Sequence, residues 1–118
     1  CDYIKVYDRM KKYYDTLQNY EGTTIQKAAY AHLQLAKVHP FLDGNGRLAR
    51  LVLNYMLIEG GYLPISIPAK DKLHYFELLE EFKVNKTQVP FEEYLEVLVN
   101  REYDRLIDLI DHYKNKQA

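Results

Sequence analysis

The chain has 118 residues, of which 47% are hydrophobic and 28% are charged, and 16 Lys and Arg against 17 Asp and Glu leave a net charge of −1. These proportions are typical of one globular domain, and they exclude a disordered tail, a collagen-like repeat and a membrane-spanning protein. The balanced charge also argues against a dedicated binder of nucleic acid or of anionic membranes.

Cys1 is the single cysteine, which excludes an internal disulfide and a thiolate zinc site and fits a reducing, cytoplasmic location. No basic region followed by an apolar run marks a signal peptide. The chain starts in the middle of a helical pattern rather than at a methionine. We therefore expect residues 1–118 to form a single domain core that is a fragment of a longer chain.

Residues 3–20 show apolar side chains at helical spacing, with Lys and Asp between them. This stripe, which we expect to pack into the core rather than to present targets, consists of Tyr3, Val6, Tyr7, Met10, Tyr13, Tyr14 and Leu17. Thr23, with Gln26 three residues later, resembles a capping box that begins a second helix. That helix is expected to end at about Val38, because Pro40 disfavours helical geometry in the residue before it.

The loop 39–46 separates the second helix from a third, which runs from Arg47 to about Glu59. Nearly every residue of the third helix is apolar, which predicts a helix buried on all sides at the centre of the molecule. Gly60 and Gly61 end it. The sequence therefore predicts an all-α bundle built around this helix.

Residues 62–68 contain two prolines and are expected to form an extended connector. Apolar residues at helical spacing predict a further helix from about Ala69 to Phe82. Pro90 opens the last helix, in which the polar residues 100–102 are expected to cause a split or a kink.

The stretch 39–50, HPFLDGNGRLAR, carries residue types that a helical bundle does not need for packing. The backbone N–H groups of residues 44–46 can form a nest for an anion at the start of the third helix, where the helix dipole adds about half a positive charge. Arg47 and Arg50 share one helix face and can clamp a polyphosphate, although an ordinary surface role for Arg50 stays open.

Asp43 lies beside this cationic region in the sequence. Its carboxylate either holds a Mg²⁺ shared with phosphate oxygens or simply caps the helix. The imidazole of His39 can take a proton from a hydroxyl nucleophile. Together these residues predict metal-assisted attack on a nucleotide phosphate. The chain contains no P-loop sequence, and an EF-hand loop beginning at Asp43 would have the wrong residues at its calcium ligands.

This stretch resembles the Fic-domain motif HxFx[D/E]GNGRxxR and matches it at every fixed position. The matching residues are His39, Phe41, Asp43, Gly44, Asn45, Gly46, Arg47 and Arg50. The helix before the motif and the segment after it, LVLNYMLIEGGYLPI, also look like the family, so the resemblance covers roughly residues 20–99.

The resemblance implies a Fic-type helical bundle and a Mg²⁺-dependent protein adenylyltransferase, which transfers AMP from ATP to a Ser, Thr or Tyr hydroxyl of a protein and releases pyrophosphate. It implies that His39 is the general base, that Asp43 holds Mg²⁺ and that Phe41 anchors the loop. The residues that it assigns to ATP and its phosphates are Asp43, Gly44, Asn45, Gly46, Arg47, Arg50, Tyr75 and Phe76. Arg rather than Lys at position 47 disfavours the branch of the family that phosphorylates its target.

Two parts of the family pattern are not found in this sequence: the strand pair of the flap that docks the target, and the [S/T]xxxE[G/N] string of the inhibitory helix. These two parts concern target recognition and regulation rather than the core chemistry. Two alternatives to the transferase also stay open: a nucleotide-binding regulatory module without transfer activity, and an enzyme that removes AMP from a modified protein. The expected partners are ATP and a hydroxyl-bearing protein, with the chain itself as one candidate. No nucleic acid or membrane partner is expected, and the oligomeric state is left open.

Four polar residues outside the motif need a separate assignment. We expect His32, His74 and His112 to have ordinary packing or surface roles. Asn54 lies one helical turn after Arg50, and it either faces the nucleotide or pairs with the backbone.

Overall fold

The computed structural model describes residues 3–38 and 45–117. Every regular element in these ranges is helical, which confirms the all-α prediction. The elements are α1 (Tyr3–Gln18), α2 (Thr24–Val38), α3 (Asn45–Glu59), the short 3₁₀ helix η1 (Ala69–Asp71), α4 (Lys72–Asn85) and α5 (Val89–Gln117).

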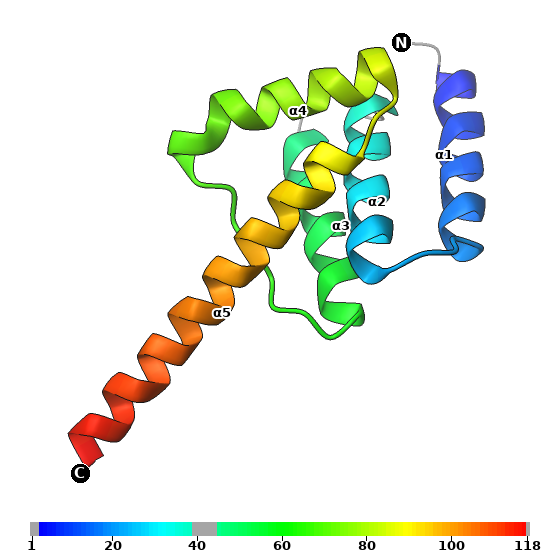
Figure 1. Cartoon of the computed structure of the whole chain (residues 1–118). Helices are drawn as coiled ribbons and strands as arrows, with labels where there is room; N and C mark the ends of the chain where they lie inside the picture. The colour runs from blue at the N-terminus through cyan, green and yellow to red at the C-terminus, as the bar shows by residue number, and fades with distance from the viewer. Residues whose placement is uncertain (1–2, 39–44, 118) are drawn as a thin grey trace.

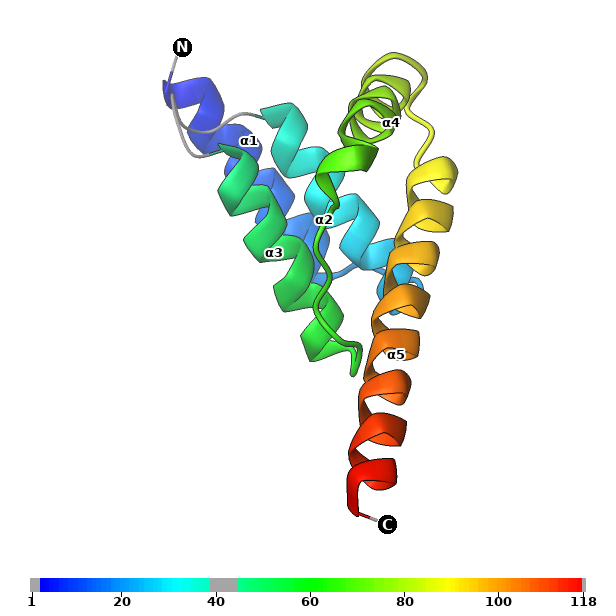
Figure 2. The same ribbon diagram turned by 90° about the vertical axis from the view of Figure 1, so that its left-hand side faces the viewer.

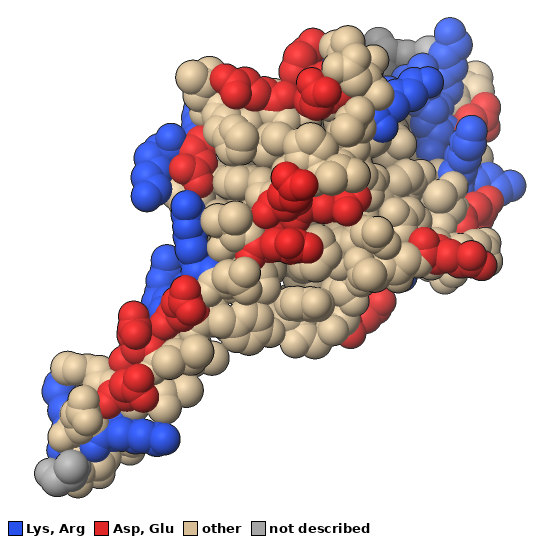
Figure 3. Space-filling model, viewed as in Figure 1, with Lys and Arg blue, Asp and Glu red and all other residues tan. Residues whose placement is uncertain are grey.

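The first three helices lie side by side and alternate in direction, with α2 between α1 and α3 (Figures 1 and 2). α4 crosses one end of α2 and α3, and α5 descends from the end of α4 across the body. The second half of α5 then projects away from the other helices. Acidic and basic side chains are interspersed over the visible face, in keeping with the net charge of −1 (Figure 3).

The helix at the centre is α2, and the prediction that α3 is buried on all sides is wrong. α2 contacts each of α1, α3, α4 and α5. On α3, one face is buried and the other is open, with Leu51 68% exposed, Tyr55 60% and Ile58 55%. The reason is that, within residues 3–38 and 45–117, α3 has neighbours on one side only, so its apolar composition did not decide its burial.

Small residues explain why α2 can have so many neighbours. Ala28, Ala29 and Ala31 are fully buried, and a methyl side chain lets adjacent helices approach closely. The body has two apolar clusters, one formed by α2 with α3, α4 and α5 and one formed by α1, α2 and α3. α2 contributes to both clusters and so joins them.

Local signals placed the helix ends well. Thr23 and Gln26 form the predicted capping box: the Gln26 N–H donates to Thr23 Oγ1 at 3.1 Å, and the Thr23 N–H donates to Gln26 Oε1 at 2.9 Å. α3 ends in a left-handed turn at Gly61, whose φ is 91°. A Cβ at Gly60 would overlap the side chain of Thr24, so this glycine lets the end of α3 pack on the start of α2.

Two other predictions need correction. Residues 100–102 do not interrupt the last helix, because α5 is continuous from Val89 to Gln117. Asn100 and Arg101 are exposed, and a polar side chain on the solvent face does not break a helix. On α1, Tyr13 is buried as expected, but Tyr7 and Tyr14 are 67% and 62% exposed, so only part of the tyrosine stripe belongs to the core.

Candidate active site

α3 starts at Asn45, so the end of the GNG sequence forms the first turn of that helix. The predicted residues His39, Phe41, Asp43 and Gly44 lie outside the described part of the chain, and their roles stay predictions. The described residues contain no group of three or more His, Cys, Asp or Glu side chains that could hold a metal ion.

Arg50 lies over the first turn of α3. A Cβ at Gly46 would come 3.6 Å from Nη1 of Arg50, which shows that the guanidinium folds back toward the N-terminus of the helix. The first N–H groups of a helix have no partner within that helix, and together with a guanidinium they form an environment that favours an anion. Arg47 is exposed on the same turn.

A pocket of about 920 Å³ opens beside this turn, between α2, α3, the connector 62–68 and α4. Gly46 and Arg50 line it from α3, and Tyr75 and Phe76 line it from α4. Arg47 is not among its lining residues in the described part of the chain. The pocket has the size of a small-molecule site, and it combines an apolar wall with the cationic helix start.

Three lysines that the sequence analysis did not single out also line the pocket. They are Lys37 at the end of α2 and Lys72 and Lys83 on α4, with Glu80 the one carboxylate among the lining residues described. The Nζ of Lys72 lies 5.9 Å from the centre of the Phe76 ring. The spacing of four residues on one helix was the available signal for that pair.

His32 is a fully buried side chain of α2 that ties α3 and α4 together. Its Nδ1 lies 2.9 Å from the Ala49 carbonyl oxygen, and its Nε2 lies 2.6 Å from the Tyr75 hydroxyl. A carbonyl can only accept, so Nδ1 carries the hydrogen, and the Tyr75 O–H donates to Nε2. The ring also stacks on Phe91, with centres 5.2 Å apart.

Burial lowers the pKa of His32 to about 4, and the nearby charge of Arg50 acts in the same direction. The ring is therefore neutral at physiological pH, as the tautomer requires. The expectation of a packing role for His32 is confirmed. His74 and His112 are exposed, as expected of ordinary surface residues.

The aromatic pair on α4 divides into an inner and an outer residue. Tyr75 is 8% exposed and its hydroxyl points to His32, whereas Phe76 is 51% exposed. Both line the pocket, but Phe76 offers most of its ring to a ligand.

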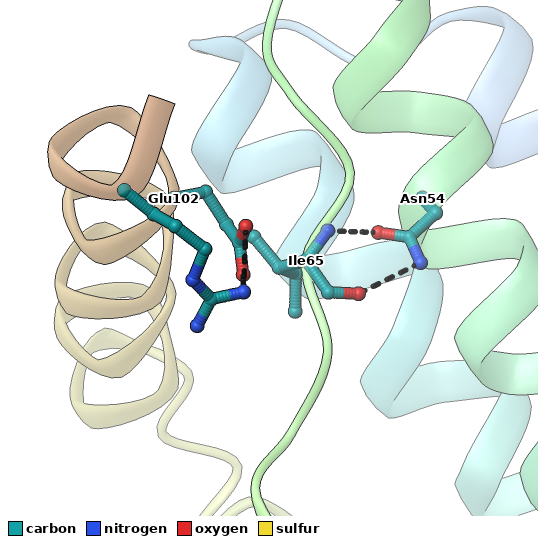
Figure 4. Close-up of polar contacts among 4 residues, drawn as sticks. Asn54, Ile65 and Glu102 are labelled. Atoms are coloured by element: carbon teal, nitrogen blue, oxygen red, sulfur yellow. Dashed lines mark hydrogen bonds and ion pairs between the residues drawn. The ribbon is translucent and has the colours of Figure 1, made fainter. Parts of the chain in front are cut away.

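Asn54 pairs with the backbone, one of the two roles considered for it, and it also lines the pocket. Its Nδ2 donates to the Ile65 carbonyl oxygen at 3.0 Å, and the Ile65 N–H donates to its Oδ1 at 2.8 Å (Figure 4). These two bonds fix the connector against α3. The connector residues Ile65, Ser66, Ile67 and Pro68 line the pocket, so Asn54 helps to shape that wall.

Residues 1–57 match the Fic/DOC family. A protein adenylyltransferase Fic from Drosophila persimilis is 45% identical over 56 residues, which make up 48% of this chain and 11% of that protein. The protein adenylyltransferase fic-1 of Caenorhabditis elegans is 36% identical over 93 residues, 76% of this chain and 18% of that protein. The chain thus spans less than a fifth of the length of these relatives.

Solved structures of Fic proteins are also similar to this chain in fold. A structure of Fic-1 from C. elegans superposes with a TM-score of 0.81 at 32% identity, covering 88% of this chain and 32% of that one. A variant of the same protein superposes with a TM-score of 0.82. The similarity therefore extends well beyond the motif helix. No helix in the described ranges has both the length and the apolar character to cross a bilayer.

Proposed function

Because the chain belongs to the Fic/DOC family, we propose that it is a protein adenylyltransferase, which transfers AMP from ATP to a hydroxyl group of a protein. The observation that carries the proposal is the pocket at the start of α3, where Arg50 and the first helical turn meet the aromatic wall of α4. An anion-binding helix start beside an exposed aromatic ring matches the two ends of a nucleotide.

In this proposal the polyphosphate lies at the N-terminus of α3, near Gly44, Asn45 and Gly46. Arg47 and Arg50 supply the positive charge that phosphate oxygens require. The base lies toward Phe76, and Lys72 beside that ring adds a cation at the rim. The three pocket lysines raise the local concentration of an anionic ligand.

The chemistry is one substitution at the α-phosphorus of ATP. The oxygen of the protein hydroxyl forms a bond to that phosphorus, the bond to pyrophosphate breaks, and His39 takes the hydroxyl proton. Asp43 is the residue that would hold Mg²⁺, which supplies neutralisation of phosphate charge when bound. The single cysteine supports a reducing compartment, and we place the reaction in the cytoplasm on that basis.

The test uses ATP labelled at the α-phosphate, with the chain itself and a cell extract as acceptors, and ATP binding measured in parallel by calorimetry. We expect His39→Ala to lose about 10²–10⁴-fold in transfer rate, the usual contribution of a general base, while its ATP affinity stays within twofold. His112→Ala, on the exposed part of α5, is the matched control and should keep both properties.

Asp43→Ala should weaken transfer in a way that added Mg²⁺ partly restores, because its carboxylate is the proposed metal ligand. ATP binding without transfer in the unaltered chain would favour the regulatory-module alternative. Failure to bind ATP at all would contradict the proposal.

A further inference from the structure

His32 lies behind the pocket rather than in it. Its side chain is fully buried, and it is not among the described residues that line the cavity. Both of its hydrogen-bond partners do line the cavity, Ala49 from α3 and Tyr75 from α4. The ring therefore holds the back of two walls of the pocket at once, without itself reaching a ligand.

Each partner of His32 is followed directly in the chain by a residue that the pocket presents to a ligand. Arg50, whose guanidinium folds back over the first turn of α3, comes after Ala49, and the half-exposed Phe76 comes after Tyr75. The Tyr75 and Phe76 rings also contact each other, with centres 5.6 Å apart. A shift of Ala49 or Tyr75 would therefore move the guanidinium or the outer ring with it.

The separation of the two walls depends on α2. In the described ranges, the backbones of α3 and α4 do not contact each other, and each of these helices packs on α2. Apolar contacts are not directional, so by themselves they define the position of α4 on α2 less sharply than hydrogen bonds do. His32 supplies two such bonds, 2.9 Å long to the Ala49 carbonyl oxygen and 2.6 Å long to the Tyr75 hydroxyl. Its stacking on Phe91 of α5, with 4° between the ring planes, fixes the plane of the imidazole.

An imidazole is not needed at this place for packing alone. A buried polar ring stabilises a core less than an apolar side chain does, unless its nitrogens are hydrogen-bonded. Both nitrogens of His32 are used here, and they bind different walls of the pocket. What the histidine adds to packing is therefore a defined separation between α3 and α4.

We propose that His32 is a positioning residue, which sets the distance between the phosphate end of the pocket at Arg50 and the aromatic end at Phe76. This inference rests on the proposed function, because it takes ATP as the ligand that spans both ends. Such a ligand gains affinity from both ends only when their separation matches its own length. A ligand that uses one end alone does not depend on that separation. His32 should therefore matter for ATP and not for a free polyphosphate.

Calorimetry with ATP and with inorganic tripolyphosphate, each with excess Mg²⁺, tests the proposal. His32→Leu keeps an apolar side chain in the core and removes both hydrogen bonds. It should weaken ATP binding about tenfold, as loss of a buried hydrogen bond does, and leave tripolyphosphate binding within about twofold. His32→Gln keeps an acceptor for the Tyr75 hydroxyl and should recover most of the ATP affinity.

Tyr13→Phe is the matched control. The Tyr13 hydroxyl is also buried and donates to the Ala31 carbonyl oxygen of α2 at 2.7 Å, but Tyr13 is not among the described residues that line the pocket. The substitution removes a similar bond between α1 and α2, so it should lower the free energy of unfolding and leave ATP affinity unchanged. Equal losses of ATP affinity in Tyr13→Phe and His32→Leu would mean that binding only follows stability, and would overturn the proposal.

Tyr75→Phe is the second variant, and circular dichroism checks that each variant is folded. It removes the hydroxyl that binds His32 and keeps the ring, so it should weaken ATP binding and spare tripolyphosphate binding even if His32→Leu does not fold. Added to His32→Leu, it should cause no further loss, because the hydroxyl acts through His32. A full further loss would mean that the hydroxyl contacts ATP itself, which would contradict the proposal.

Two other results would also overturn the positioning role of His32. One is a loss of tripolyphosphate affinity as large as the loss of ATP affinity, and the other is unchanged ATP affinity in both His32→Leu and Tyr75→Phe. In each of these cases the unaltered chain still binds ATP. Failure of the proposed function is a different result, in which the unaltered chain binds no ATP and both proposals are wrong.

Discussion

α2 and α3 are neighbouring helices of 15 residues each. Their composition alone would predict that α3 is the more buried of the two, and the structure shows the opposite. α3 carries the larger apolar side chains, yet α2 is the helix surrounded by the rest of the body. α2 has three buried alanines and a buried histidine, while α3 leaves Leu51 and Tyr55 in solvent. Small side chains gave α2 room for four neighbours, whereas large ones only made one face of α3 a good packing surface.

The largest expected effect is a difference in unfolding free energy between substitutions on the buried and the exposed face of α3. Leu53 is 1% exposed and Leu51 is 68% exposed, so the same substitution can be made on each face. Leu53→Ala should lower the free energy of unfolding by about 2–5 kcal/mol, because it leaves a cavity between α3 and α2. Leu51→Ala should change it by no more than about 0.5 kcal/mol. Denaturant unfolding measures both, and equal losses would mean that α3 is covered on both faces.

The buried histidine of α2 should make stability depend on pH. Its pKa is lowered to about 4 in the folded chain and is about 6.5 when unfolded. As the pH falls, this histidine therefore takes up its proton in the unfolded chain before it does so in the folded chain. Its contribution to the free energy of unfolding is fully present above pH 6.5 and decreases by up to about 3 kcal/mol as the pH drops toward 4.

Unfolding curves at several pH values, compared between variants, isolate this effect from that of the carboxylates. In His32→Gln, the free energy of unfolding should no longer decrease between pH 6.5 and 4 through this histidine. In His74→Gln, where the replaced side chain is exposed, the decrease should remain. A full slope in His32→Gln would place the titrating group elsewhere.

A smaller effect tests whether small residues hold α2 in place. Ala29 is fully buried, and Ala29→Leu should cost about 1–3 kcal/mol of unfolding free energy because the neighbouring helices must move apart. Ala69 is exposed on η1, and Ala69→Leu serves as the control with little change expected. If both substitutions were neutral, close approach would not explain the central position of α2.

Local features of the fold could be predicted from the sequence, because their causes lie within a few residues of each other. The capping box at Thr23 and the turn at Gly60 and Gly61 set helix ends directly. The central position of α2 could not be predicted, since it depends on contacts with helices far along the chain. The possible break at 100–102 was wrong for a similar reason: whether polar residues interrupt a helix depends on which face meets solvent.

The candidate site shows the same division. The motif indicated Arg50 and the turn at Gly46, which are close in sequence and lie together on α3. The bond between His32 and Tyr75 joins residues 43 positions apart, and no local pattern signals it. The lysines of the pocket rim come from two helices, so their convergence also needed the three-dimensional arrangement.

The central claim is that ATP lies in the pocket between α2, α3 and α4, and photolabelling with 8-azido-ATP tests it most directly. After irradiation, peptide mapping should find the label on α4 near Phe76 or on the facing residues of α2 and α3, and excess ATP should prevent the labelling. Arg50→Ala should reduce it. Label on the outer surface of α1, or labelling that excess ATP does not reduce, would contradict the account.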